Sequence, residues 1–160
     1  MRKKILRILR ENAKASNKDI ADRLDITESK VIDIIKELEK DGVIKGYQAI
    51  IDDSILPESQ VKAVIYVNVV PQREGGFDLI AKRLAKFPEV TSLYLVSGGF
   101  DLELEIQGKT LQEVAGFVSG KLSTIEGVTS TATHFILKKY KESGRLLEGN
   151  NEYKRLKVSP

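Results

Sequence analysis

The chain has 160 residues, of which 41% are hydrophobic and 31% charged, so it is long enough for one compact domain or two small ones. It contains no cysteine, which excludes disulfides, thiolate metal ligands and cysteine nucleophiles. The net charge of +3 is unevenly distributed: residues 1–50 carry 12 basic and 9 acidic side chains, whereas residues 51–137 carry 7 basic and 11 acidic ones. This distribution favours a protein that contacts a polyanion through one domain, and randomly scattered surface charge is the alternative.

The first element is a predicted helix over residues 1–12. Ile5, Leu6 and Leu9 share one face of it, and arginines and lysines line much of the rest. No small-residue cleavage site follows this basic start, and no apolar run in the sequence has the length needed to span a bilayer. We therefore expect no signal peptide and a cytoplasmic protein.

Residues 17–47 (NKDIADRLDITESKVIDIIKELEKDGVIKGY) predict two short helices with a tight connection. Ser16 followed by Asp19 is the pattern of a capping box, and Thr27 is suited to cap the second helix. Val31, Ile35 and Leu38 give that helix an apolar stripe, and Gly42 ends it. This pattern favours a helix-turn-helix whose second helix enters the DNA major groove, although an ordinary pair of packed helices has the same periodicity.

The residues expected to contact DNA lie opposite the apolar stripe or at the start of the second helix. After the second helix, Val43-Ile44 begins an extended segment, and Lys45-Gly46 would form a tight wing in it. Residues 47–52 are predicted to form a strand, and the stretch around Pro57 a hinge. The predicted DNA-binding residues are Thr27, Glu28, Ser29, Lys30, Asp33 and Lys36, with Lys45 on a phosphate.

A second domain follows with the order β-α-β-β-α-β. Strands are predicted over 61–70, 90–97, 102–106 and 128–137, and helices over 77–87 and from Thr110 to Gly127. This order is the ferredoxin-like arrangement, so the predicted fold class is α+β: a winged helix-turn-helix followed by a ferredoxin-like domain. Residues 141–160 are polar and weakly patterned, and we expect a mobile or partner-packed tail.

The first strand of this domain is apolar on both faces. Ala63, Ile65, Val67 and Val69 form one face, whereas the other carries Val64, Tyr66 and Val70. Two helices cover only one face of a ferredoxin-like sheet. The second apolar face therefore predicts a homodimer built sheet against sheet.

Catalysis has no positive signal in the sequence. His134 is the single histidine, and a structural role is favoured for it because no second histidine or thiol is present for a metal. Glu103 and Glu105 point the same way on one strand, where a solvated or dimer-facing surface is favoured over an acid/base pair. No nucleophile elbow, phosphate-binding loop or zinc-protease motif occurs. We expect no enzyme activity, no metal and no cofactor.

The turn Gly98-Gly99-Phe100-Asp101 combines two glycines with a carboxylate. A plain hairpin explains one glycine. Two adjacent glycines also let a small ligand approach the backbone N–H groups, and Asp101 offers a partner for an ammonium group. Both interpretations stay open on the residues alone.

Four stretches together resemble the Lrp/AsnC family of feast/famine transcription regulators. They are Asn17–Ala21, Val31–Glu39 followed by GVIKGY, LVSGGFD at 95–101, and TSTATHFILKKYKE at 129–142. The resemblance covers the chain to about residue 142 and preserves order and spacing. It implies a DNA-binding domain over 1–46, a strand and hinge linker over 47–60, an effector-sensing and oligomerisation domain over 61–140, and a tail over 141–160.

The resemblance also implies dimers, often assembled into octamers, that bind double-stranded DNA and respond to an amino acid. It places the effector between dimers, so residues from a second subunit are expected to complete the site. The expected effector-binding residues are those of the turn, with Thr131 and Thr133 of the last strand for hydroxyl contacts: Ser97, Gly98, Gly99, Phe100, Asp101, Thr131 and Thr133. Two alternatives come from other functional classes. Siroheme decarboxylases look like this family but act in heme synthesis, where a tetrapyrrole site would be expected to use more than one histidine. A small-molecule binder that does not contact DNA is the third possibility.

Overall fold

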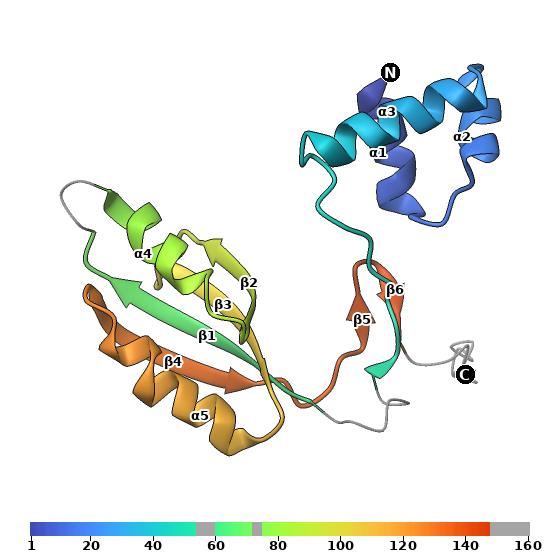
Figure 1. The fold of residues 1–160 in the computed structure, drawn as a ribbon. Coiled ribbons are helices and arrows are strands. Elements are labelled where there is room, and N and C mark those ends of the chain that lie inside the picture. The colour runs from blue at the N-terminus through green and yellow to red at the C-terminus, as the bar shows by residue number, and fades with distance from the viewer. Residues whose placement is uncertain (54–59, 72–74, 148–160) are drawn as a thin grey trace, which may run out of the picture. The chain divides into compact units, whose positions relative to one another are not determined.

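The computed structural model describes residues 1–53, 60–71 and 75–147. It divides into two compact units, Met1–Ile50 and Ile51–Pro160, which Figure 1 shows as a helical unit and an α/β unit. The predicted division at residue 46 and the observed one at residue 50 differ by a few residues. Each unit has its own buried core and is described separately.

The first unit consists of α1 (Arg2–Glu11), α2 (Asn17–Leu24) and α3 (Glu28–Lys40). The predicted capping box is present: the Ser16 hydroxyl accepts a hydrogen bond from the Asp19 N–H at 3.0 Å, and the Asp19 carboxylate accepts one from the Ser16 N–H at 3.4 Å. Asp25 has φ +52°, and its left-handed conformation turns the chain from α2 into α3. Ile5, Ile20, Ala21 and Val31 form a core that joins all three helices.

The segment after α3 differs from the expectation. Residues 47–52 form no strand, so the predicted strand there is wrong, and the predicted hinge around Pro57 lies outside the described residues. The segment is instead fixed by side chains, because the Tyr47 hydroxyl donates a hydrogen bond to the Glu39 carboxylate at 2.9 Å. Partial burial, together with that carboxylate, raises the Tyr47 pKa above its usual 10.0.

The second unit is a four-stranded antiparallel sheet in the order β2-β3-β1-β4. Its strands are β1 (Val61–Val69), β2 (Val90–Leu95), β3 (Leu102–Gly108) and β4 (Val128–Phe135). Figure 1 shows α4 (Gly76–Leu84) and α5 (Leu111–Gly120) covering one face of the sheet. This strand order and helix placement are those of the predicted ferredoxin-like fold.

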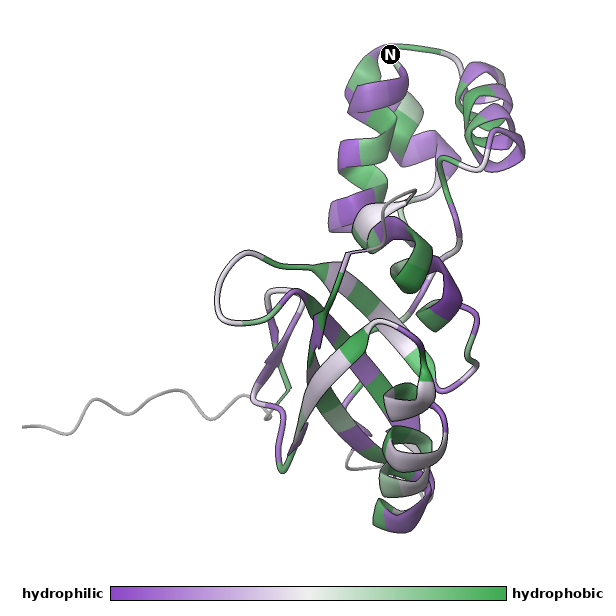
Figure 2. Cartoon of the chain, turned by 90° about the vertical axis from the view of Figure 1, so that its left-hand side faces the viewer, coloured by the Kyte–Doolittle hydropathy of each residue, from purple (hydrophilic) through white to green (hydrophobic). Residues whose placement is uncertain are grey.

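The two faces of the sheet have different surroundings. Along β1, Ala63, Ile65 and Val67 are buried beneath the helices, whereas Val64 and Tyr66 between them are only partly buried. The alternation of apolar and more polar residues along the strands is visible in Figure 2. The cross-strand register places Glu103, Glu105, Ala132 and His134 on the same face as Val64 and Tyr66, and we call this face the open face.

Both helices of this unit are shorter than predicted. α4 ends at Leu84, and tighter turns, with hydrogen bonds from Lys86 N–H to Arg83 and from Phe87 N–H to Leu84, carry the chain to Pro88, which would in any case disfavour a helical conformation at Phe87. The predicted helix from Thr110 to Gly127 is broken at Lys121. A short 3₁₀ helix, η2 (Leu122–Thr124), follows, and the Thr124 hydroxyl donates to the freed carbonyl of Lys121 at 2.8 Å.

The start of the predicted tail is ordered, which corrects the expectation for residues 141–147. β5 (Lys141–Glu142) and β6 (Arg145–Leu146) form a two-stranded hairpin whose turn contains Ser143 and Gly144, both with positive φ. Lys139 forms ion pairs with Glu142 and with Asp53. The predicted tail beyond residue 147 lies outside the described residues. Within those residues, no helix has the length and apolar character to cross a membrane.

Candidate functional site

The first candidate surface is the start of α3. The Thr27 hydroxyl accepts a hydrogen bond from the Lys30 N–H at 3.4 Å and so caps the helix. All six predicted contact residues at this helix are exposed, while Val31 and Leu38 on the opposite side are buried. The helix therefore presents a polar face next to a tight helix-turn-helix corner, which is the arrangement that enters a major groove.

This surface has mixed charge. Lys30 and Lys36 lie among Glu28 and Asp33, so the helix face is not itself basic. Its capped N-terminus adds partial positive charge from unpaired backbone N–H groups. Lys45 is exposed, but it does not sit in a paired wing: its ammonium bends back to within 3.0 Å of the position that a Cβ on Gly42 would take.

The second candidate surface is the turn between β2 and β3. Gly98 has φ +146°, and a Cβ built on Gly98 or on Gly99 would meet no atom within 4 Å. The backbone of this turn is therefore accessible, as expected. Ser97 and Phe100 are exposed beside the glycines.

Asp101 has a structural role that the sequence did not reveal. Its carboxylate Oδ2 accepts a hydrogen bond from the Val69 N–H at 2.9 Å, and its own N–H donates to the Val67 carbonyl at 3.1 Å. Its carbonyl accepts from the Val96 N–H at 2.9 Å. Asp101 thus joins the turn to the end of β1, and its second carboxylate oxygen keeps acceptor capacity for a ligand.

Aromatic contacts connect this turn to the open face. The Phe100 ring stacks on Tyr66 with centroids 4.7 Å apart and planes inclined by 18°, and His134 meets the edge of Tyr66 at 5.4 Å. The sequence pattern predicts only a place in a dimer surface for Tyr66. Its contact with Phe100 depends on the pairing of β1 with β3, which no local pattern in the sequence indicates.

Thr131 and Thr133 do not join this cluster. These two residues of β4 pair with Val67 and Ile65 on β1. They therefore lie on the helix-covered face of the sheet, opposite the Phe100–Tyr66 stack. Within one subunit the structure therefore brings together the glycine turn, Asp101 and Phe100, but not the two threonines. Within the described residues, no three side chains of His, Asp or Glu are grouped so as to hold a metal ion.

Comparison with known proteins identifies both units. Residues 62–146 match the model of the Lrp/AsnC ligand binding domain, and residues 1–45 match a winged helix-turn-helix DNA-binding model. An uncharacterised HTH-type transcriptional regulator of Bacillus subtilis, YugG, is 47% identical over 98% of this chain and 95% of its own. The regulator FL11 of Pyrococcus horikoshii is 35% identical over 90% of this chain and 92% of its own.

Solved structures agree with these sequence relatives. A transcriptional regulator of Neisseria meningitidis, solved as a complex with L-Met, is 26% identical, covers 92% of this chain and 94% of its own, and superposes with a TM-score of 0.65. The relatives described are all named as regulators, and nothing among them supports the siroheme decarboxylase alternative.

Proposed function

The chain belongs to the Lrp/AsnC family of DNA-binding transcription regulators, and from that premise we propose that an amino acid bound at the Gly98–Asp101 turn controls its assembly and DNA occupancy. The observation that carries the proposal is the turn itself. Its glycine backbone is accessible, it holds a carboxylate with spare acceptor capacity, and it contacts the open face through Phe100.

DNA contact is proposed for the exposed face of α3. Ser29, Lys30, Asp33 and Lys36 would face base edges or phosphates, and Thr27 and Glu28 would lie at the helix N-terminus beside the backbone. Because the helix face is of mixed charge, we assign much of the phosphate attraction to the helix N-terminus and to the basic residues of α1.

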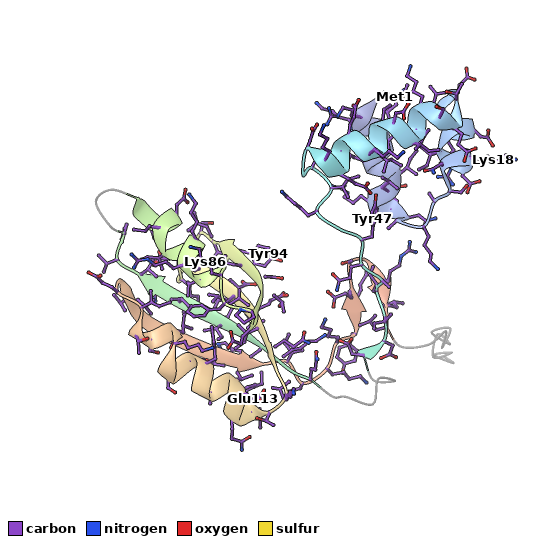
Figure 3. The ribbon with its side chains drawn as sticks, viewed as in Figure 1. Met1, Lys18, Tyr47, Lys86, Tyr94 and Glu113 are labelled. Carbon is purple, nitrogen blue, oxygen red and sulfur yellow. The ribbon has the colours of Figure 1, made fainter. Side chains whose placement is uncertain are left out.

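Assembly is proposed to proceed through the open face. In a single subunit Tyr66 and Val64 are partly exposed there, and Tyr94 on β2 is 50% exposed. Figure 3 shows Tyr94 beside the sheet strands. Pairing two open faces would remove these side chains from water and place two DNA-binding units in one dimer, which suits a pseudo-palindromic operator.

The effector would act through that assembly. Backbone N–H groups at Gly98 and Gly99 would donate hydrogen bonds to its carboxylate, and Asp101 would accept a charge-assisted hydrogen bond from its ammonium group. Phe100 lies between this site and the open face, because it stacks on Tyr66. A ligand that binds one assembly more tightly than another shifts the population toward that assembly.

The test uses two glycine substitutions in the same unit. Gly99→Leu fills the turn without backbone strain, because the φ of Gly99 is not positive and its Cβ has open space. Gly120→Leu makes the same change at the end of α5, where the space is also open. We expect calorimetry with the twenty amino acids to detect binding to wild type and Gly120→Leu but not to Gly99→Leu. Equal binding by all three proteins, or no binding by any, would contradict the proposed site.

A further inference from the structure

A cleft lies at the opposite end of β3 from the glycine turn. This cleft has a volume of about 310 Å³, at the lower end of the range of small-molecule sites, roughly 300–1,000 Å³. Its walls come from the end of β3, from one side of α5 and from Glu89, which precedes β2. Figure 3 shows Glu113 in the first turn of α5, at this end of the sheet.

The cleft combines an apolar wall with an incompletely satisfied carboxylate. Ile106, Val114 and Phe117 are buried and supply the wall. Glu89 forms an ion pair through Oε1 with Lys121, and this hydrogen bond is the main cause that lowers the pKa of Glu89 below its usual 4.5. The other oxygen, Oε2, is shielded from solvent and accepts no hydrogen bond from another described residue; the nearby backbone N–H of Glu89 itself favours the carboxylate but does not form a well-aligned hydrogen bond to Oε2. A buried acceptor without a donor is costly, so this oxygen favours an N–H or O–H from a ligand or a water.

The charges of the lining residues indicate which charge a ligand of the cleft would carry. Glu89 and Glu113 bring two negative charges and Lys121 one positive charge, so the cleft holds an excess of one negative charge. The Lys121 ammonium is also held 5.8 Å from the Phe87 ring centroid and 6.0 Å from that of Phe117, in addition to its pairing with Oε1. The remaining acceptor, Oε2, is therefore left for another donor.

We propose that this cleft binds a small organic cation, whose ammonium group donates to Glu89 Oε2 and whose short apolar body lies on Phe117. Gly116 gives the ligand room, because a Cβ at this position would meet no atom within 4 Å and a longer side chain would occupy the cleft. This site is separate from the proposed effector site, since the cleft residues and the glycine turn lie at opposite ends of β3.

Three probes with the same carbon chain test the proposal on the full-length protein. Butylammonium carries the donor and the charge, 1-butanol a neutral donor, and butyrate the opposite charge. Titration calorimetry should show butylammonium binding at least about tenfold more tightly than 1-butanol, and no binding of butyrate, because charge-assisted hydrogen bonds are the stronger class. On addition of butylammonium, the amide NMR shifts of Gly108 and Gly116 should change, and those of Gly98 and Gly99 should not. This pattern distinguishes binding in the cleft from binding at the proposed effector site.

Two variants locate the binding within the cleft. Glu89→Gln keeps the size of the side chain and removes its charge, and Gly116→Leu fills the cleft while leaving the Glu89–Lys121 pair in place. We expect each variant to weaken butylammonium binding at least about tenfold, whereas Gly120→Leu on the same helix binds as wild type does. The proposal is overturned if butylammonium and 1-butanol bind alike, if neither binds at millimolar concentration, or if either Glu89→Gln or Gly116→Leu binds butylammonium as tightly as wild type does.

Discussion

At the scale of single residues, Asp101 combines a structural contact with a proposed ligand contact. Its Oδ2 accepts from the Val69 N–H, so removing the whole side chain would disturb the end of β1 as well as any ligand. Asparagine retains an acceptor oxygen but not the charge, and it therefore separates the two roles.

We expect Asp101→Asn to keep the unfolding temperature of the second unit close to that of wild type. It should weaken amino-acid binding about tenfold or more, because the side chain that pairs with the ligand's ammonium group no longer carries a negative charge. Asp78→Asn on the exposed side of α4 is the charge-matched control. Calorimetric titration and thermal unfolding measure the two effects. An Asp101→Asn variant that binds with wild-type affinity would leave Asp101 with the structural role alone.

The capping box of α2 makes a second prediction at this scale. Ser16→Ala should destabilise the helical unit by about 1 kcal/mol, since it removes the acceptor for the Asp19 N–H. Urea unfolding followed by helical circular dichroism measures this loss. The matched Ser123→Ala change, at an exposed position in η2, should leave the midpoint unchanged. A wild-type midpoint for Ser16→Ala would show that the cap contributes nothing.

The same box predicts a dependence on pH. The hydrogen bond from Ser16 is the main cause that lowers the pKa of Asp19 in the folded state below its usual 3.8. The stabilisation is therefore fully present above that value and is lost as the pH falls below it. Asp19→Asn should make the unfolding midpoint of the helical unit less sensitive to acid in that range. A pH profile parallel to that of wild type would contradict this assignment.

At the scale of elements, the pattern of apolar residues was sufficient to predict most helices and strands but not their ends. The stripe of Val31 and Leu38 and the alternation along β1 both produced buried positions where expected. The break at Lys121 and the hairpin after residue 140 were missed, because they depend on turn contacts such as those of Thr124 and Ser143 that carry little periodicity. The accessible backbone of the Gly98–Asp101 turn was predictable from its two glycines. The Phe100–Tyr66 stack was not, because it depends on the register of β1 with β3.

The role proposed for α3 predicts a change in salt dependence. Lys30→Ala should weaken DNA binding, with a larger loss at low salt if its contact is with a phosphate, and it should reduce the slope of log affinity against log salt by about 1. Lys86→Ala, which removes the same charge from the second unit, is the control. Fluorescence anisotropy across a salt series measures both. Identical slopes for Lys30→Ala and wild type would argue against this placement of α3.

At the scale of the whole molecule, the proposed function depends on pairing of the open face with the open face of a second subunit. Val64 lies on that face opposite Glu105, so Val64→Lys forms a cross-strand pair of opposite charge in a single subunit but places a charge in the proposed interface. We expect light scattering to report a lower mass for Val64→Lys than for wild type at equal micromolar concentration. Ser123→Lys should assemble normally, and a monomeric wild type would contradict the proposed dimer.

The proposed assembly reads a specific DNA sequence and responds to an amino acid. The most direct measurement is selection of bound sequences from a pool of randomised duplex DNA by the full-length protein, with and without the amino acid identified by calorimetry. We expect enrichment of one pseudo-palindromic motif, bound roughly a thousandfold or more above random DNA, and a change in its occupancy when the amino acid is added. A pool that stays random, or a motif whose occupancy is the same with and without the amino acid, would contradict it.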